Sequence, residues 1–293
     1  MSAAGYAGFL RLMGHRLREE AGVYWFNVHS RIYMSFPFQT PVDPDSIQVR
    51  KVLGRDGLVL RHTCPLGKGR LSYRIAINEA GYDLQSLTGK ARNQTRRGLE
   101  RCRVQHLDFA SFTRECVALN RDTLLRQGRA IPSGFDDYWQ RYYGYAGQAD
   151  GAQIWGAFFE GELAAYLISF EMEGVAHILI LRSKAELLRH YPNNALLFSY
   201  MKSVLGSGSI REVSIGLESI QCGMDSLDRF KTNMGFQKVP VGQCIAFTPW
   251  LRPFVAGRIG RVVRSLVEQH RGNERIDKMA GMLRWYAEQE SAR

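Results

Sequence analysis

The chain has 293 residues, of which 45% are hydrophobic and 23% are charged, and its formal net charge is +11. This composition excludes a disordered chain, and it is sufficient for one large domain or two small ones. The excess of lysine and arginine favours a polyanionic partner, such as nucleic acid, an acidic membrane surface or a phosphate-rich ligand. An ordinary basic enzyme of bacterial type is the alternative.

Residues 1–102 form the first predicted segment, which is rich in strands. Residues 22–36 predict one strand, residues 46–62 predict two strands joined by a turn at residues 54–57, and residues 69–77 predict a further strand. The segment ends in a basic helix, expected at residues 84–101. Four arginines lie on adjoining faces of this helix: Arg92, Arg96, Arg97 and Arg101. They either bind phosphate groups or form a solvated helix face.

Residues 103–248 form the second predicted segment, in which strands and helices alternate. We expect the order β-α-α-β-β-β-α-β-α-β, with Asp108 as the N-cap of the first helix. The central strands are joined by tight turns at Glu160-Gly161 and Glu173-Gly174. The later strands are joined through helices at residues 193–205 and 224–233, which favours parallel pairing. The predicted fold is therefore α/β, with a mixed sheet and helices on its faces.

Residues 249–293 form a predicted helical tail. The segment 250–267 carries arginines opposite a stripe of apolar residues, namely Leu251, Phe254, Val255, Ile259, Val262, Val263, Leu266 and Val267. Such a helix packs on its own domain, pairs with a second subunit, or lies on an anionic membrane. A second amphipathic helix is expected at residues 274–289.

The five cysteines predict free, buried thiols in a reducing compartment. No CxxC pair occurs, the spacings match no zinc site, and we therefore expect no metal. The cysteines are Cys64, Cys102, Cys116, Cys222 and Cys244.

The sequence also predicts a cytoplasmic protein. Arg11 and His15 interrupt the apolar stretch near the N-terminus, so we expect no signal peptide. No uncharged run reaches the ~18 residues that are needed to span a bilayer. Peripheral contact at the inner face of the membrane, through residues 250–267, remains the alternative.

The stretch FKTNMGF, residues 230–236, carries a family resemblance. It resembles the FK-x-x-(apolar)-G-F signature of the FemABX-like branch, also called the BioF2-like acetyltransferase branch, of the GNAT acyltransferases. The arginine-rich helix matches the same branch. So does the strand end IGLES, at residues 215–219, which precedes FKTNMGF in the chain. The resemblance covers residues 103–248 and implies a GNAT fold there. Residues 1–102 would be a reduced counterpart of a first GNAT half.

In a GNAT protein, a CoA thioester lies between two splayed central strands, which would here be residues 175–182 and 212–217. The resemblance implies that the donor is held by Leu181, Arg182, Arg189, Asn193 and Asn194. A helix that begins near residues 192–193 offers N–H groups and a positive dipole to a pyrophosphate. The glycine-rich loop of most GNAT proteins is absent, because residues 182–195 contain no glycine.

The resemblance also implies the catalytic residues. Lys231 stands where most GNAT proteins have the tyrosine that protonates the leaving thiolate, and a lysine there would stabilise an oxyanion or the donor phosphates. Phe230 would pack against the donor. Glu218, at a strand end, and His177, within a strand, are the candidate general bases. The alternatives are a solvated lysine at a helix end and a structural histidine.

The sequence and its family resemblance together predict an N-acyltransferase. It would transfer an acyl group from acyl-CoA to an amine of a small molecule, a lipid or a cell-wall precursor. The first alternative keeps the fold and takes aminoacyl-tRNA as donor, as Fem ligases do. The basic charge and the missing glycine loop favour tRNA, whereas the reduced first half disfavours it. The second alternative is a non-catalytic protein that binds a polyanion.

Overall fold

The computed structural model describes residues 2–221, 225–270 and 274–291. The chain forms two compact units, each assembled from separate stretches of sequence. The first unit comprises residues 1–13, 75–216 and 229–237, and the second comprises residues 14–74, 217–228 and 238–293. The boundaries predicted at residues 102 and 248 stay predictions. Cys222 and the expected helix start at Met224 lie outside the described residues.

The first unit contains a sheet with the strand order β10-β9-β8-β7-β6. β9 pairs in parallel with β10, whereas the other neighbours are antiparallel. The mixed sheet predicted for this part of the chain is therefore confirmed. Its strands are β6 (Cys102–Leu107), β7 (Ala152–Phe159), β8 (Glu162–Met172), β9 (Val175–Ser183) and β10 (Glu212–Leu217, of which Leu217 belongs to the second unit). β5 (Arg70–Ile77) contributes residues to both units.

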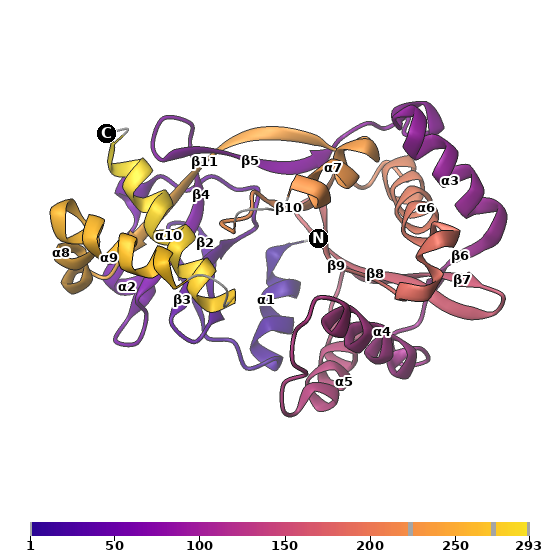
Figure 1. The fold of residues 1–293 in the computed structure, drawn as a ribbon, viewed down its shortest axis with the longest axis horizontal. Helices are drawn as coiled ribbons and strands as arrows, with labels where there is room; N and C mark the ends of the chain where they lie inside the picture. Colours follow the sequence, from indigo (N-terminus) through magenta and orange to yellow (C-terminus); the bar gives the residue numbers. More distant parts are fainter. Residues whose placement is uncertain (1, 222–224, 271–273, 292–293) are drawn as a thin grey trace. The chain divides into compact units, whose positions relative to one another are not determined.

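Helices cover both faces of this sheet (Figure 1). Phe170 of β8 packs against Tyr6 and Phe9 of α1, whereas Tyr200 of α6 contacts Trp155 of β7, whose partner on β8 is Leu167. Because Leu167 and Phe170 are three residues apart on one strand, they point to opposite faces of the sheet, and so α1 and α6 cover opposite faces. α3 packs on α6, and α4 and α5 lie on the side of α1. The helices are α1 (Ala3–Leu12), α3 (Gly89–Arg101), α4 (Thr113–Arg126), α5 (Phe135–Ala146) and α6 (Pro192–Gly206).

The two tight hairpins predicted in this sheet are confirmed. Both residues of each turn have positive φ: 51° and 84° at Glu160 and Gly161, and 54° and 73° at Glu173 and Gly174. This backbone matches a two-residue type I′ turn, whose twist suits antiparallel strands. The first helix, in contrast, begins at Thr113 rather than near Asp108. Asp108 instead accepts hydrogen bonds from Ser111 and so closes the turn before the helix.

The second unit contains strands in the order β1-β2-β3-β4-β11. The single strand predicted at residues 22–36 is wrong, because the chain turns at residues 30–31 and forms the antiparallel pair β2–β3. β3 is parallel to β4, and β4 is antiparallel to β11. The strands are β1 (Leu17–Glu20), β2 (Val23–His29), β3 (Ile32–Phe36), β4 (Val59–Cys64) and β11 (Gln237–Phe247, of which Gln237 belongs to the first unit).

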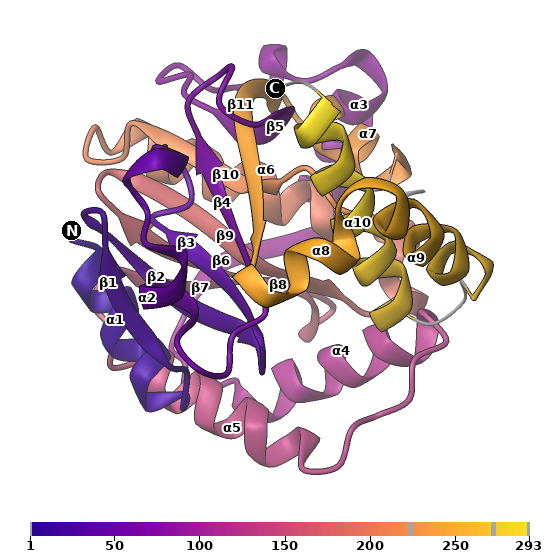
Figure 2. The ribbon, with the colours of Figure 1, turned by 90° about the vertical axis from the view of Figure 1, so that its left-hand side faces the viewer.

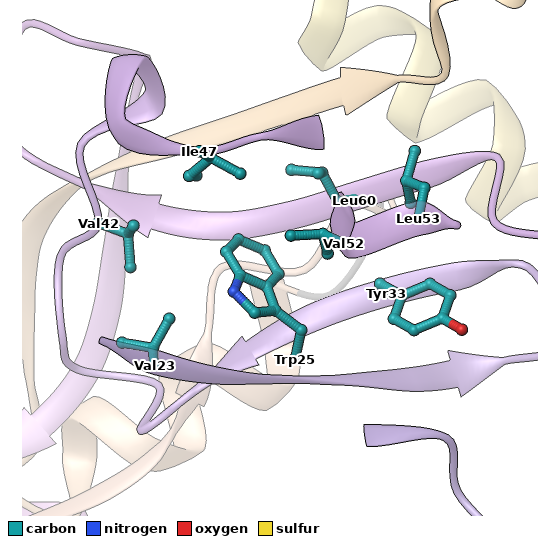
Figure 3. Packing of buried hydrophobic residues seen from close by; sticks show 8 residues of the cluster. All are labelled: Val23, Trp25, Tyr33, Val42, Ile47, Val52, Leu53 and Leu60. Atoms are coloured by element: carbon teal, nitrogen blue, oxygen red, sulfur yellow. The ribbon is translucent and has the colours of Figure 1, made fainter. Parts of the chain in front are cut away.

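The hairpin predicted at residues 46–62 is also wrong, because its first half is helical. η1 (Pro44–Ser46) leads into α2 (Val49–Leu53), which Gly54 ends with φ 59°. Val49, Val52 and Leu53 have the i, i+3, i+4 spacing of a helix face, and they pack on the cluster around Trp25. Figure 3 shows the Trp25 indole surrounded by the side chains of this cluster. α1 and β1 were not predicted.

The predicted C-terminal helices are present, as η4 (Pro249–Leu251), α8 (Arg252–Val255), α9 (Gly257–Gln269) and α10 (Glu274–Ser291). Figure 2 shows α9 beside α10, and the two helices are in contact. Met282, Leu283, Trp285 and Tyr286 of α10 pack on Ile245 and Phe247 of β11 and on Val59 of β4. None of the helices in the described part of the chain is both long and apolar enough to cross a membrane.

Candidate active site

The two strands predicted to splay apart, β9 and β10, pair only at their beginnings. The register joins Glu212 to Val175, Val213 to Ala176 and Ser214 to His177, and it goes no further. β9 continues to Ser183, and over this length it pairs with β8 on its other side. Beyond His177, β9 therefore does not pair with β10, as the predicted splay requires.

A β-bulge accounts for the separation of the two strands. Ile168 of β8 pairs with Ile180 and Ser169 pairs with Ile178, so Leu179 is an extra residue on β9. A bulge bends its own strand and increases the local twist. His177 is the last residue of β9 that pairs with β10, and Leu179 lies two residues further along the strand. The bend therefore begins where the pairing ends.

The end of β9 leads to the start of α6. η3 (Ala185–His190) connects them, and Pro192 occupies the first position of α6, as expected for a helix start. Asn193 Nδ2 donates to Ser183 Oγ at 3.1 Å, while Asn193 Oδ1 is buried and has no hydrogen-bond partner. An unsatisfied buried acceptor is costly, so this amide oxygen is suited to accept an N–H of a ligand.

The remaining predicted donor residues differ in their surroundings. Leu181 and Arg182 are half-buried, and Arg182 Nη1 donates to the carbonyl of Leu181. Arg189 is exposed, and its Nε lies 3.1 Å from Nε2 of His190, a half-buried ring stacked on Phe159.

The helix α3 passes close to the first turn of α6. A Cβ at Gly98 would lie 2.7 Å from the carbonyl oxygen of Tyr191 and 3.2 Å from Cβ of Ala195. The same carbonyl accepts hydrogen bonds from the backbone N–H groups of Asn194 and Ala195. Two amides of the first turn are thus already engaged, which leaves less of the helix terminus for a phosphate.

The end of α7 (Asp225–Asn233) joins these elements. Met234 Sδ accepts from Asn194 Nδ2 at 3.4 Å, and its carbonyl accepts from the Tyr82 hydroxyl at 2.8 Å. Gly235 has φ 93°, and a side chain there would also crowd Ser86 O and Tyr82 at 3.1 Å. The glycine of the signature is therefore required by the backbone path at the end of α7.

Lys231 is buried within the first unit, with 9% of its surface exposed. Its carbonyl accepts from the N–H groups of Met234 and Phe236, so Lys231 lies in the last turn of α7. Phe230 is half-buried. Lysine is almost never buried unless its ammonium is paired. Lys231 is thus not the solvated lysine of the alternative interpretation.

The two candidate bases have surroundings of their own. His177 is 2% exposed and stands opposite Phe170, so its side chain lies on the face of the sheet covered by α1, away from α6. Glu218 belongs to the second unit. Its Oε2 accepts from Arg70 Nη1 at 2.8 Å and from Ser72 Oγ at 2.7 Å.

The arginine helix contains two kinds of arginine. Arg96, Arg97 and Arg101 are exposed. Arg92 is half-buried, and its guanidinium donates to the carbonyls of Leu84 and Leu87. Arg92 therefore stabilises the turn before α3, whereas the other three present their charge to solvent.

The sequence did not reveal a buried arginine in the second unit. Arg61 donates from Nε to Gln243 Oε1 and from Nη2 to the carbonyl of Glu218, both at 2.8 Å. Arg61 and Arg70 both stack on Trp285, at 4.8 and 4.2 Å from the ring centroid. Burial lowers the pKa of Arg61 to about 10, an effect that Glu218 partly opposes. No local pattern could have predicted this cluster, because its members are far apart in sequence.

The structure therefore brings some of the candidate residues together. The end of α7, with Phe230 and Lys231, is joined through Met234 to the start of α6, which carries Asn193 and Asn194. His177 is not part of this group, and Glu218 belongs to the second unit. Among the described residues, no cluster of histidine, cysteine, aspartate or glutamate could hold a metal ion. Cys64, Cys102, Cys116 and Cys244 are buried thiols, as predicted.

Comparison with known proteins identifies the family. Residues 86–231 match the family model of the acetyltransferase (GNAT) domain. The sequence matches no curated protein.

Similar folds occur among the solved structures. FemX is 11% identical, with a TM-score of 0.61 over 85% of this chain and 92% of its own. L-PGS from Bacillus licheniformis is 17% identical, with a TM-score of 0.51 over 91% and 92%. A tandem GNAT protein from the clavulanic acid biosynthesis pathway is 12% identical, with a TM-score of 0.51 over 84% and 88%. The family match and the splayed strands together show that the chain belongs to the GNAT acyltransferases and has the fold of their FemX-like branch.

Proposed function

We propose that this protein transfers an acyl group from acyl-CoA to a primary amine. The amine nitrogen attacks the thioester carbonyl, the C–N bond forms, and the C–S bond breaks. The nitrogen loses one proton, and the CoA thiolate takes one up. The observation that carries this proposal is the end of β9–β10 pairing at His177 and Ser214, next to the bulge at Leu179.

The donor arm suits the edge that β9 leaves open. Pantetheine contains two amide groups, and these can pair with peptide groups as an added strand does. Asn193 Oδ1, which has no partner and lies 10 residues beyond Ser183, can accept an amide N–H. The start of α6 then lies at the phosphate end of the donor, with Arg189 exposed before it.

Lys231 is the proposed electrostatic group of this site. Attack on the thioester places negative charge on the carbonyl oxygen, and a fixed cation lowers the free energy of that state. A buried ammonium is more effective than a solvated one, because the surrounding dielectric is low. Phe230, in the same turn of α7, would pack against the donor.

No general base is assigned from the described geometry. The imidazole of His177 lies on the sheet face that α1 covers, and the carboxylate of Glu218 is held by Arg70 and Ser72. An amine that arrives in its neutral form needs only water to accept its proton after attack. The rate should then rise with pH until the acceptor amine is deprotonated.

A second donor, an aminoacyl-tRNA, is favoured by a different observation. α3 crowds the first turn of α6 at Gly98, and residues 182–195 contain no glycine that would let a CoA pyrophosphate approach the backbone closely. Arg96, Arg97 and Arg101 on the exposed side of α3 would instead contact tRNA phosphates. The acceptor would then be the amine of a lipid or a cell-wall precursor.

A donor screen separates these candidates. Radiolabelled acyl-CoAs and charged tRNAs are offered to the pure protein with a mixture of amines, and label in the amide product is counted. Transfer from acyl-CoA supports the first proposal, and transfer from tRNA alone supports the second. Binding of either donor without transfer would favour the remaining candidate, a non-catalytic protein that binds a polyanion.

A variant of Asn193 tests where the donor binds. Asn193→Ala should raise the KM for the donor roughly tenfold, the scale of one lost hydrogen bond, with little effect on kcat. Asn93→Ala, on the exposed side of α3, is the matched control. Equal KM values for the donor in the two variants would show that Asn193 does not bind the donor.

A further inference from the structure

The segment η4–α8–α9 of the second unit exposes apolar side chains that the fold does not use. Val255 and Val263 pack against the cluster that contains Phe247 and Tyr286, as does Val267 one turn further along α9. The inner face of α9 is therefore covered. The apolar stripe predicted from the sequence includes more residues than those that make this contact. The other apolar residues of the stripe face solvent.

The exposed apolar residues form a row on α9. Ile259, Val262 and Leu266 are each more than half exposed. Their i, i+3, i+7 spacing places them on one side of the helix. The preceding turns add two aromatic residues, Trp250 at 61% and Phe254 at 54% exposure.

Arginines accompany this row. Arg258 and Arg261 are exposed on α9, and Arg252 is exposed at the start of α8. Arg258 stands four residues before Val262 and so lies beside the row, and Arg261 lies one turn after Arg258 on the same side of the helix. Residues 249–270 contain four arginines and one acidic residue, Glu268. The surface is therefore both apolar and cationic.

We propose that this surface docks on an anionic lipid bilayer, with α9 lying in the plane of the headgroups. A helix with an apolar edge, flanking arginines and nearby aromatic residues has the composition of an interfacial membrane helix. Each arginine near an anionic surface makes the binding free energy more favourable, and partial burial of the apolar row adds to this effect. The aromatic rings of Trp250 and Phe254 suit the headgroup level.

A second copy of the chain is a poorer occupant. A two-fold symmetric contact brings the same patch of both copies together. Arg258 and Arg261 of one copy would then face those of the other, and like charges oppose such a contact. An anionic lipid surface satisfies the apolar row and the arginines at the same time. This inference does not depend on the donor of the proposed acyl transfer.

Vesicle co-sedimentation of the full chain tests the proposal. Vesicles of phosphatidylcholine alone are compared with vesicles that also contain phosphatidylglycerol, at low and at high NaCl. We expect binding to the anionic vesicles that weakens with salt. Absence of binding to anionic vesicles at low salt overturns the proposal.

Two pairs of variants assign the binding to this surface. Val262→Ser with Leu266→Ser should lower the partition coefficient about tenfold or more, whereas Leu71→Ser, at a residue 71% exposed on β5, should not. Arg258→Gln with Arg261→Gln should abolish most of the preference for phosphatidylglycerol, about tenfold or more. The control is Arg50→Gln with Arg55→Gln, at two exposed positions.

All four variants change exposed residues, so their thermal midpoints should stay close to that of the parent protein. A parent-like partition coefficient in Val262→Ser with Leu266→Ser would overturn the proposal. Sedimentation equilibrium could also overturn the proposal, if the parent protein is a dimer and Val262→Ser with Leu266→Ser is a monomer. The apolar row would then be an interface between copies.

Discussion

The side-chain amide of Asn194 donates a hydrogen bond to the sulfur of Met234, with 3.4 Å between Asn194 Nδ2 and Met234 Sδ. This contact ties the start of α6 to the end of α7. Thr95 of α3 reaches the same sulfur, at 3.9 Å from its hydroxyl. The last turn of α7, which carries Lys231, is therefore held at the helix start where the donor is proposed to bind.

Replacing Lys231 tests its role most simply. Lys231→Met keeps the aliphatic stem and removes the charge, so the fold should persist while kcat falls by ~10²-fold or more, the usual scale for a lost oxyanion donor. Lys231→Arg should restore activity only in part, since a planar guanidinium does not replace a compact ammonium. Steady-state kinetics and circular dichroism provide the two readouts.

The control for Lys231 is Lys202→Met, which removes an exposed lysine of α6 in the same unit. Its kcat should match that of the parent protein. Parent-like turnover in Lys231→Met as well would show that FKTNMGF is a packing motif.

Much of the first unit could be predicted from sequence because its signals are local. The Glu-Gly turns at residues 160–161 and 173–174 and the apolar strand between them define the hairpins. The bulge at Leu179 could not be predicted, since it depends on how β8 pairs with β9. The motif singled out Lys231, but its burial results from packing between distant segments.

The first hundred residues were predicted less well, for different reasons. α2 is a five-residue helix, and its apolar residues also fit a strand over so short a length. α1 was missed although Tyr6, Ala7 and Leu10 have helical spacing and are buried. The arginines of α3 were treated as one set, and only tertiary hydrogen bonds distinguish Arg92 from the others.

The contact of α3 with α6 makes a prediction about stability. Ala in place of Gly within a helix normally stabilises it by up to ~1 kcal/mol. Gly98→Ala should instead destabilise the protein by ~1–3 kcal/mol, because the new Cβ meets the backbone oxygen of Tyr191 at 2.7 Å. Gly144→Ala in α5, where no atom lies within 4 Å, should be stabilising. Urea unfolding of both variants gives the comparison, and a stabilising Gly98→Ala would contradict the close packing.

The arginines of α3 should separate into two classes. Replacing Arg96, Arg97 and Arg101 together by Gln should weaken tRNA binding and reduce its salt dependence, with little change in the thermal midpoint. Arg92→Gln should lower the free energy of unfolding by ~1–3 kcal/mol, because the carbonyls of Leu84 and Leu87 lose their donor. Filter binding over a salt series and urea unfolding measure the two effects. An unchanged salt slope in the triple variant would make these arginines a solvated face.

His62 should make stability depend on pH. Burial lowers the pKa of His62 to about 4, against 6.5 for the free side chain, so the folded protein holds this ring neutral. Between these values the unfolded chain binds more protons, and the contribution of His62 is lost as pH falls from about 6.5 towards 4. We expect about 2–3 kcal/mol less stability at pH 4.5 than at pH 7 from this group.

The variant His62→Gln isolates that contribution. Chemical unfolding at a series of pH values should show a smaller loss of stability on acidification in His62→Gln than in the parent protein. Parallel curves for the two proteins would mean that His62 does not titrate differently in the folded and unfolded chains.

Hydrogen–deuterium exchange with and without an acyl-CoA shows whether the donor lies along the open edge of β9. We expect slower amide exchange in residues 178–183 of β9 and in residues 193–195 of α6 when the donor is bound, with no change in β6 (Cys102–Leu107). Unchanged exchange in residues 178–183 under donor concentrations that support turnover would contradict this expectation, because the acyl donor would then bind elsewhere.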